Sequence, residues 1–466
     1  MTIGVLPDNV LLDIFDFYLG QVRRVDAWHT LVHVCRQWRE VVFTSPRRLD
    51  LQLLCTTKRP VIATLDVWPA LPIAIDSVGA RMQQQDMVNI MDALKQHDRV
   101  SKFNIQNIPK SLFSIFAAMK EPFPSLTELK ISSPYITVPI VPDSFLGGST
   151  PQLRTLELDG IPFSALGKLL LSTSNLVDLD LRSIPRSGYI SPQAIVTGLE
   201  ASTRLKKLAI EFESSQSRAN RASWHTPPLT RIVLPALTTL VFKGDGQYLE
   251  AIVSRIDAPL LDRLEANFFR QPTLDIPQLR DLISRTGVFT AFHQARVDIC
   301  PSGVIVTLSQ RKGMLDSGTL MLGISCIPSN RQPSAASQLS AVAKLCNSSI
   351  LPLPTLERLI IDGGGFPLSQ DNIGAPQWLE FLQPFTRVKY LALSEESVPL
   401  IAPALQQLAG ERATEYLPVL QTLFLQRPGP YRNLYRTVEE AIEKFIAARR
   451  LSGRRVTLIV PVGSIC

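Results

Sequence analysis

The residues best suited to chemistry lie close together in the segment 26–51, DAWHTLVHVCRQWREVVFTSPRRLDL. Cys35 could act as a nucleophile if a nearby base lowered its pKa. His29 and His33 stand one helical turn apart and could share a metal ion. However, the sequence offers no identifiable base for the thiol, no Glu after His29 and no evident third ligand. We therefore expect no catalytic residue, metal site or cofactor here, and interpret the segment as a packing surface.

The elements that carry these residues are predicted to be three short helices. The first should begin near Pro7, where a helix can start without losing a needed hydrogen bond, and end at Gly20. A second stripe has Asp26 as its candidate N-cap and contains Trp28, Leu31, Val32 and Cys35. After a break the stripe continues with Trp38, Val41 and Val42, and Ser45-Pro46 stops the last helix. Three helices make only a small core, which needs a partner or a following domain.

This N-terminal segment resembles the F-box, through Leu6-Pro7, the run LLDIF and then VCRQW at the family's spacing. The resemblance implies a three-helix module that docks on the Skp adaptor of a cullin-based ubiquitin ligase. Asn9 departs from the pattern, since the family often has Glu there. An unrelated helical bundle with a Cys and Trp core is the alternative. By resemblance, the adaptor-binding residues are Leu6, Pro7, Val10, Leu11, Ile14, Phe15, Leu19, Val32, Val34, Cys35, Trp38 and Val42.

After residue 50 the pattern L-x-x-L-x-L recurs with a period that indicates repeats. Neighbouring copies are 23 to 32 residues apart, except for one long gap before Leu356. The copies begin at or near Val100, Leu126, Leu153, Leu176, Leu205, Leu237, Leu261, Leu356, Val388 and Leu420. Helix-like runs lie between them, from QQQDMVNIMDALKQ to VEEAIEKFIAARRLS.

This spacing is typical of degenerate leucine-rich repeats, without the Asn of the common consensus. We predict an α/β chain with an F-box over residues 1–50 and a horseshoe solenoid over 51–466. Near 288–326, three strand-like runs predict an insertion in the array. The polar stretch from Ser214 to Pro228 is expected to be a surface loop. The combination of F-box and degenerate repeats resembles F-box proteins abundant in mushroom-forming fungi.

Charge suggests two candidate binding surfaces. Alternation along the strands would stack outward carboxylates into an acidic patch on the concave face, where a basic substrate could dock. Plain solvated surface is the favoured alternative. At the other end, the interval from Arg427 to Arg455 holds eight basic and three acidic residues, a large part of the net charge of +7. It could bind acidic or phosphorylated partners, or nucleic acid with Tyr431 and Tyr435, but we favour a solvated cap on the array. The candidate substrate-binding carboxylates are Glu157, Asp159, Asp178, Asp180 and Glu211.

Other features narrow the function. The six cysteines are scattered, as expected for reduced thiols, and no segment predicts a secretory signal or a membrane span. There is no phosphate-binding P-loop and no G-x-S-x-G elbow. We expect a cytoplasmic or nuclear, non-enzymatic protein that binds the Skp adaptor, cullin through it, and an unknown protein substrate, without nucleic acid or membrane. The alternatives are a repeat scaffold unrelated to ubiquitination and, least favoured, an enzyme with an unrecognised site.

Overall fold

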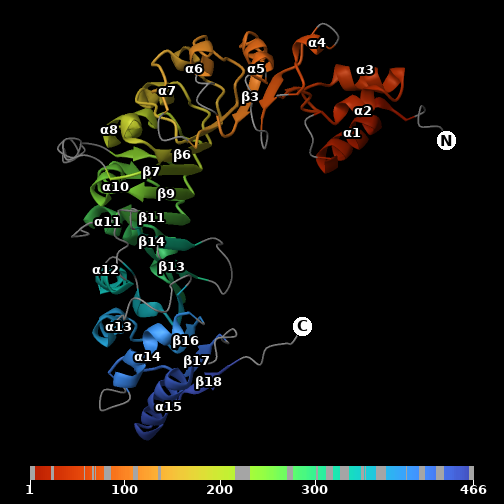
Figure 1. Cartoon of the computed structure of the whole chain (residues 1–466). Helices are drawn as coiled ribbons and strands as arrows, with labels where there is room; N and C mark the ends of the chain where they lie inside the picture. The colour runs from red at the N-terminus through yellow and green to blue at the C-terminus, as the bar shows by residue number, and fades with distance from the viewer. Residues whose placement is uncertain are drawn as a thin grey trace. The chain divides into compact units, whose positions relative to one another are not determined.

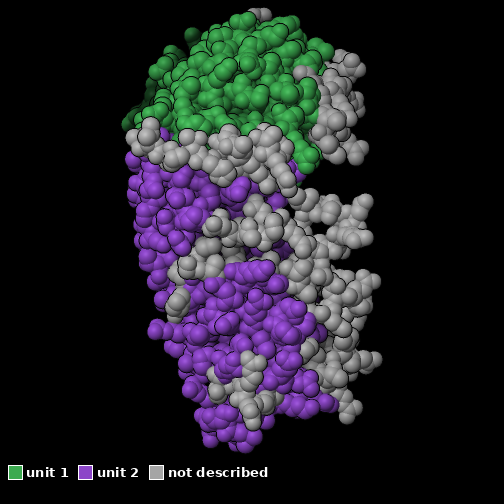
Figure 2. Space-filling model, turned by 90° about the vertical axis from the view of Figure 1, so that its left-hand side faces the viewer, with its two compact units in different colours: residues 1–213 green, residues 214–466 purple. Residues whose placement is uncertain are grey.

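The computed structural model divides the chain into two compact units, Met1–Glu213 and Ser214–Cys466, which Figure 2 colours separately. The described residues are 6–22, 26–56, 58–65, 68, 70–77, 86–108, 114–134, 138–215, 231–269, 276–300, 303–310, 318–325, 335–347, 351, 353–363, 374–394, 396–408, 415–426 and 435–460.

Three helices open unit 1: α1 (Asp8–Val22), α2 (Trp28–Val32) and α3 (Arg36–Thr44). The main-chain oxygen of Pro7 accepts hydrogen bonds from the N–H groups of Val10 and Leu11, so α1 starts as predicted. It continues through Gly20 to Val22, contrary to the expected end at Gly20. The break in the second stripe lies between α2 and α3, and α3 ends just before Ser45-Pro46 as predicted.

The rest of unit 1 alternates strands with helices on one side of the strands (Figure 1). Its strands pair in parallel in the order β1-β2-β3-β4-β5-β6-β7. The strands are β1 (Leu53–Cys55), β2 (Ile73–Asp76), β3 (Val100–Ile105), β4 (Glu128–Ser132), β5 (Thr155–Asp159), β6 (Asp178–Ile184) and β7 (Lys207–Phe212). The helices are α4 (Ile62–Leu65), α5 (Asp86–Leu94), α6 (Ser114–Ala118), α7 (Leu166–Leu170) and α8 (Pro192–Gly198), with short 3₁₀ turns at Phe145–Gly148 and Arg186–Gly188.

Unit 2 repeats this arrangement, with strands in the order β9-β11-β14-β13-β12-β15-β16-β17-β18 and a separate parallel pair, β8 and β10. The strands are β8 (Ile232–Val233), β9 (Thr239–Gly244), β10 (Ile256–Asp257), β11 (Arg263–Phe269), β12 (Gln294–Cys300), β13 (Gly303–Ser309), β14 (Thr319–Ser325), β15 (Arg358–Asp362), β16 (Tyr390–Leu393), β17 (Thr422–Leu425) and β18 (Thr457–Ile459). The helices are α10 (Gly246–Val253), α11 (Pro277–Arg285), α12 (Ala335–Asn347), α13 (Ala375–Leu382), α14 (Val398–Gln407) and α15 (Tyr435–Leu451), with 3₁₀ turns at Gly287–Thr290 and Leu353–Thr355.

The interval 288–326 contains β12, β13 and β14. β13 runs antiparallel to both of its neighbours, whereas β11 pairs in parallel with β14 and β12 pairs in parallel with β15. One reversed strand therefore interrupts an otherwise parallel order. The predicted loop at Ser214 to Pro228 lies almost entirely outside the described residues.

Each of the ten predicted repeat copies contains a strand, and the recurring leucines explain why. In β5, Leu156 and Leu158 point into the core, while Thr155, Glu157 and Asp159 are partly exposed on the other side. The period of two along the strand places one apolar row under the helices and one polar row outside. The predicted α/β class is confirmed, with strands that pair mostly in parallel in both units.

Candidate functional site

The N-terminal helices divide the twelve residues of the F-box resemblance into a core and a surface. Leu11, Phe15, Val32 and Val42 are buried between the helices, where Phe15 lies 4.7 Å from Trp38, centroid to centroid. Leu6, Leu19 and Trp38 are half-buried. The remaining five are exposed: Pro7, Val10, Ile14, Val34 and Cys35.

The exposed members include a stripe on α1. Ile14 is 44% exposed and Phe17 70%, and together with Val10 they recur at steps of four and three residues, which places them on one face of the helix. Val34, between α2 and α3, is 53% exposed. Apolar side chains of this size in one small module are typical of a protein-binding surface. Phe17 is not among the residues predicted from the sequence, although its spacing of three residues from Ile14 is a signal for the same helix face.

Cys35 has a structural role at the start of α3. It is the N-cap residue in extended conformation, and its Sγ accepts a hydrogen bond from the main-chain N–H of Trp38 at 3.5 Å. The sequence placed Cys35 on the same helical stripe as Trp28, but α2 ends at Val32 before the thiol is reached. The thiol therefore satisfies one of the free N–H groups of a helix start.

His29 and His33 belong to an aromatic cluster around Trp68. The ring of His29 lies 4.0 Å from that of Trp28 and 5.4 Å from that of Trp68, and His33 contacts Trp68 at 6.3 Å. Burial lowers the pKa of His29, against the opposing effect of Asp26. Among the described residues, no three His, Cys, Asp or Glu side chains converge as metal ligands would.

The N-terminal helices are attached to the first strands of unit 1 by polar contacts. The indole N–H of Trp28 donates to the main-chain oxygen of Gln52 at 2.9 Å in a buried position. Arg59 forms an ion pair with Asp26 across the same junction. A cavity of about 540 Å³ lies here, lined by residues of α1, α2, β1 and the following turn.

Register brings the predicted substrate-binding carboxylates onto one face of unit 1. Glu157 on β5 lies opposite Asp180 on β6, and Asp178 lies opposite Thr155. Asp159 lies opposite Arg182, and Arg182 falls inside the register shift between Leu181 and Ile184 in the pairing of β6 with β7. Glu211 lies on β7 within the same irregularity, between Ile210, which pairs with Leu181, and Phe212, which pairs with Ile184.

Asp180 was expected to be a solvated carboxylate on the strand surface. It is instead buried, with only 4% of its surface exposed. Arg182 donates two hydrogen bonds to this carboxylate, from Nε to Oδ1 at 2.9 Å and from Nη2 to Oδ2 at 2.7 Å. Lys207 from β7 adds a third, Nζ to Oδ2 at 2.6 Å. The buried carboxylate is thus held by two cations, as a buried charge requires.

The surface around Asp180 carries acidic and basic side chains side by side, and is called the mixed-charge surface. Lys130 pairs with Glu128 at 2.7 Å, and that hydrogen bond is the largest cause of the raised pKa of Lys130, to which Glu157 and Asp178 also contribute. Although desolvation opposes it, the pKa of Arg182 is raised by Asp180 and by the nearby Glu157 and Glu211. The carboxylates were predicted from the sequence, but these cations, which occupy the same outward strand positions, were not.

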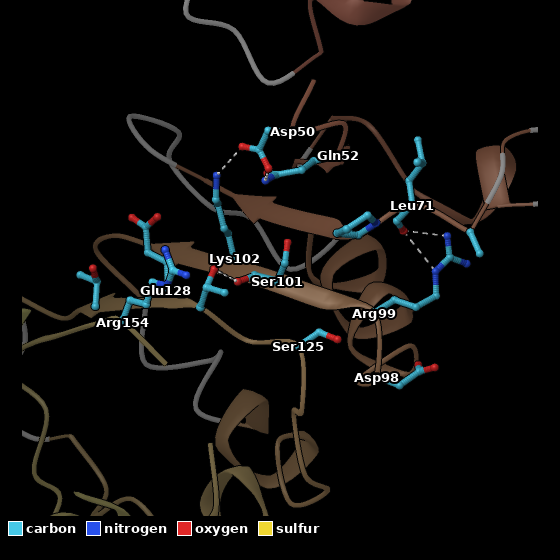
Figure 3. Close-up of a pocket in the computed structure, with 14 residues that line it drawn as sticks. Asp50, Gln52, Leu71, Asp98, Arg99, Ser101, Lys102, Ser125, Glu128 and Arg154 are labelled. Carbon is cyan, nitrogen blue, oxygen red and sulfur yellow. Dashed lines mark hydrogen bonds and ion pairs between the residues drawn. The ribbon is translucent and has the colours of Figure 1, made fainter. Parts of the chain in front are cut away.

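A groove of about 620 Å³ crosses unit 1 where β2 to β5 begin (Figure 3). Lys102 points toward Asp50, 3.6 Å away, and Arg99 donates to the main-chain oxygen of Leu71 at 2.9 Å. Within the part of the chain that the structure describes, Arg154 and Asp98 form no ion pair. Both signs of charge and several hydroxyls face this groove, so it suits a polar peptide segment rather than an apolar ligand.

The basic C-terminal run is only partly described, because Arg427, Tyr431 and Arg432 lie outside the described residues. Lys444, Arg450, Arg454 and Arg455 are exposed, as a solvated cap requires. Arg449 differs, because it is fully buried and donates to the main-chain oxygen of Leu417 at 2.7 Å. That cation therefore supports the fold and is not available to a ligand.

None of the helices within the described ranges is both long enough and apolar enough to cross a bilayer. No protein-family model matches the chain, and no curated protein matches its sequence.

Proposed function

We propose that this chain is the substrate-recognition adaptor of a Skp-cullin-F-box ubiquitin ligase. In this proposal residues 1–50 are an F-box that binds the Skp adaptor, and residues 51–466 are a leucine-rich-repeat solenoid of horseshoe type that binds a protein substrate. In this proposal the chain does not itself catalyse the transfer of ubiquitin. It contributes proximity, by holding the substrate beside a ubiquitin-loaded enzyme.

The observation that carries the proposal is the exposed apolar stripe of α1. Val10, Ile14 and Phe17 remain in solvent while Leu11 and Phe15, on the adjoining side of the same helix, are buried in the module. The core of the module is thus complete without the stripe, which leaves these side chains for another protein. Two of its three members, Val10 and Ile14, are residues that the F-box resemblance assigns to adaptor contact.

Two further features support the substrate half of the proposal. The groove at the start of β2 to β5 and the mixed-charge surface around Asp180 both lie on unit 1. The N-terminal helices are attached to the same unit by the hydrogen bond between Trp28 and Gln52. A polar peptide bound there would be held at a fixed distance from the adaptor. Charged surfaces of this kind steer partners and set specificity more than they add affinity.

The proposal is tested by capture of the tagged full chain from a eukaryotic extract, with blotting for the Skp adaptor and cullin. Beside it runs the triple variant Leu6→Ala/Pro7→Ala/Ile14→Ala, with its folding checked by circular dichroism. We expect the wild type to capture both proteins and the folded variant to capture neither. Failure of the wild type in an extract rich in adaptor would leave a repeat scaffold, without a ligase, as the function.

A further inference from the structure

The face of unit 2 that points away from the helices carries an apolar row where unit 1 carries charge. Register aligns four residues across four parallel strands: Ile360 on β15, Ala392 on β16, Phe424 on β17 and Ile459 on β18. The helices α12 to α14 lie on the other side of these strands (Figure 1). The outer face of a sheet is ordinarily polar, so an apolar row on it indicates contact with another molecule.

Aromatic and cationic side chains border this row. Tyr390 stacks on Phe424 with 6.2 Å between the ring centroids and 27° between the planes. The guanidinium of Arg358 lies 4.0 Å from the centroid of the Tyr390 ring. Tyr and Arg, held in place by stacking, are the residue types that dominate binding energy at protein interfaces.

Arg358 differs from its charged neighbours because it has no carboxylate partner among the described residues. Arg296 is shared by Asp298 at 2.7 Å and Asp362 at 2.5 Å, and Lys389 pairs with Glu357 at 2.6 Å. The Nε of Arg358, by contrast, is buried and has no hydrogen-bond partner within the described part of the chain. A guanidinium that stacks on an aromatic ring beside an apolar row, with no carboxylate among the described residues, is suited to bind an anionic group of another molecule.

We propose that this face, named the β15–β18 face and made of Arg358, Ile360, Tyr390, Ala392, Phe424 and Ile459, binds a protein segment with an aromatic or branched apolar side chain next to a carboxylate. The apolar side chain lies against Phe424 and Ile360, and the carboxylate accepts hydrogen bonds from Arg358. The inference does not depend on adaptor binding by the N-terminal helices, so each can fail without the other.

The test uses the full chain and an array of eight-residue peptides with a central Phe-Glu, Phe-Gln, Phe-Lys or Ser-Glu pair in randomised flanks. Binding of the strongest Phe-Glu peptide and its Phe-Gln counterpart is then measured by fluorescence anisotropy. We expect Phe-Glu to bind about tenfold more tightly than Phe-Gln, the size of a charge-assisted hydrogen bond. Arg358→Gln should abolish this difference, and Phe424→Ala should weaken both peptides.

Arg263→Gln is the matched control. Arg263 occupies the same register row as Arg358 but lies four strands away, roughly 19 Å at about 4.8 Å per strand, and it already pairs with Glu265. This variant should bind like the wild type. The inference is overturned if no Phe-Glu peptide binds, or if Arg358→Gln still prefers Phe-Glu over Phe-Gln. It is also overturned if sedimentation shows that the wild type is a dimer which Phe424→Asp disrupts, because the face would then be a contact between two copies of this chain.

Discussion

Trp28 and Gln52 are joined by a buried hydrogen bond of 2.9 Å from the indole N–H to the main-chain oxygen, which connects α2 to the residue just before β1. Trp28 also meets the rings of Phe43 and Trp68, at 6.0 and 5.3 Å. The three N-terminal helices therefore fold cooperatively with the rest of unit 1. We expect loss of this contact to lower the free energy of unfolding of the whole unit.

Trp28→Phe keeps an aromatic ring and removes the hydrogen bond. We expect the free energy of unfolding to fall by about 1–2 kcal/mol, since Gln52 keeps a buried oxygen without its donor. Urea denaturation followed by circular dichroism measures the change. An unchanged midpoint would show that the contact contributes nothing to unit 1.

His29 should make stability depend on pH. Its pKa is lowered by burial, so the unfolded chain takes up the proton more readily than the folded one. The stabilising effect is complete above the ordinary value of 6.5 and is lost as pH falls through the lower folded pKa. Urea midpoints at pH 5.0 and 7.5 should differ less in His29→Gln than in the wild type, with His33→Gln as the matched control. Equal pH dependence in His29→Gln and the wild type would contradict this assignment.

Thiol reactivity should separate the cysteines. Burial raises the pKa of Cys55 to about 11 and that of Cys346 to about 12, so neither presents a thiolate near neutral pH. Cys35 is exposed. In native protein at pH 7.5, N-ethylmaleimide should label Cys35 and leave the other two unmodified until urea unfolds the chain. Peptide mass mapping reads out each site, and early labelling of Cys346 would contradict its burial.

Asp180→Asn removes the anion that holds Arg182 and Lys207. Both cations are partly exposed and can turn to water, so we expect a loss of about 1–3 kcal/mol in stability rather than unfolding. Thermal unfolding measures it. Asp159→Asn, on the same face, is the control and should be near neutral. If both variants behave alike, the buried network has no special role.

The strand positions could be predicted because the L-x-x-L-x-L pattern places leucines such as Leu156 and Leu158 directly in the core. The exposed side of α1 could not be predicted in this way, because Val10 and Leu11 are similarly apolar. Only the position of α3 decides which of the two is buried. Lys207 binds Asp180 across 27 positions of sequence, a contact that strand register sets. The β15–β18 face arises in the same way, from six residues on four strands that are far apart along the chain.

Docking of α1 on a Skp adaptor through its exposed stripe can be measured by calorimetric titration of the purified full chain with recombinant adaptor. We predict binding by the wild type and a loss of at least about tenfold in affinity for Ile14→Asp, because a charge replaces an apolar contact. Leu260→Asp, a similarly exposed site in unit 2, should bind normally. No binding by the wild type, or equal binding by Ile14→Asp, would show that this stripe is not an adaptor-binding surface.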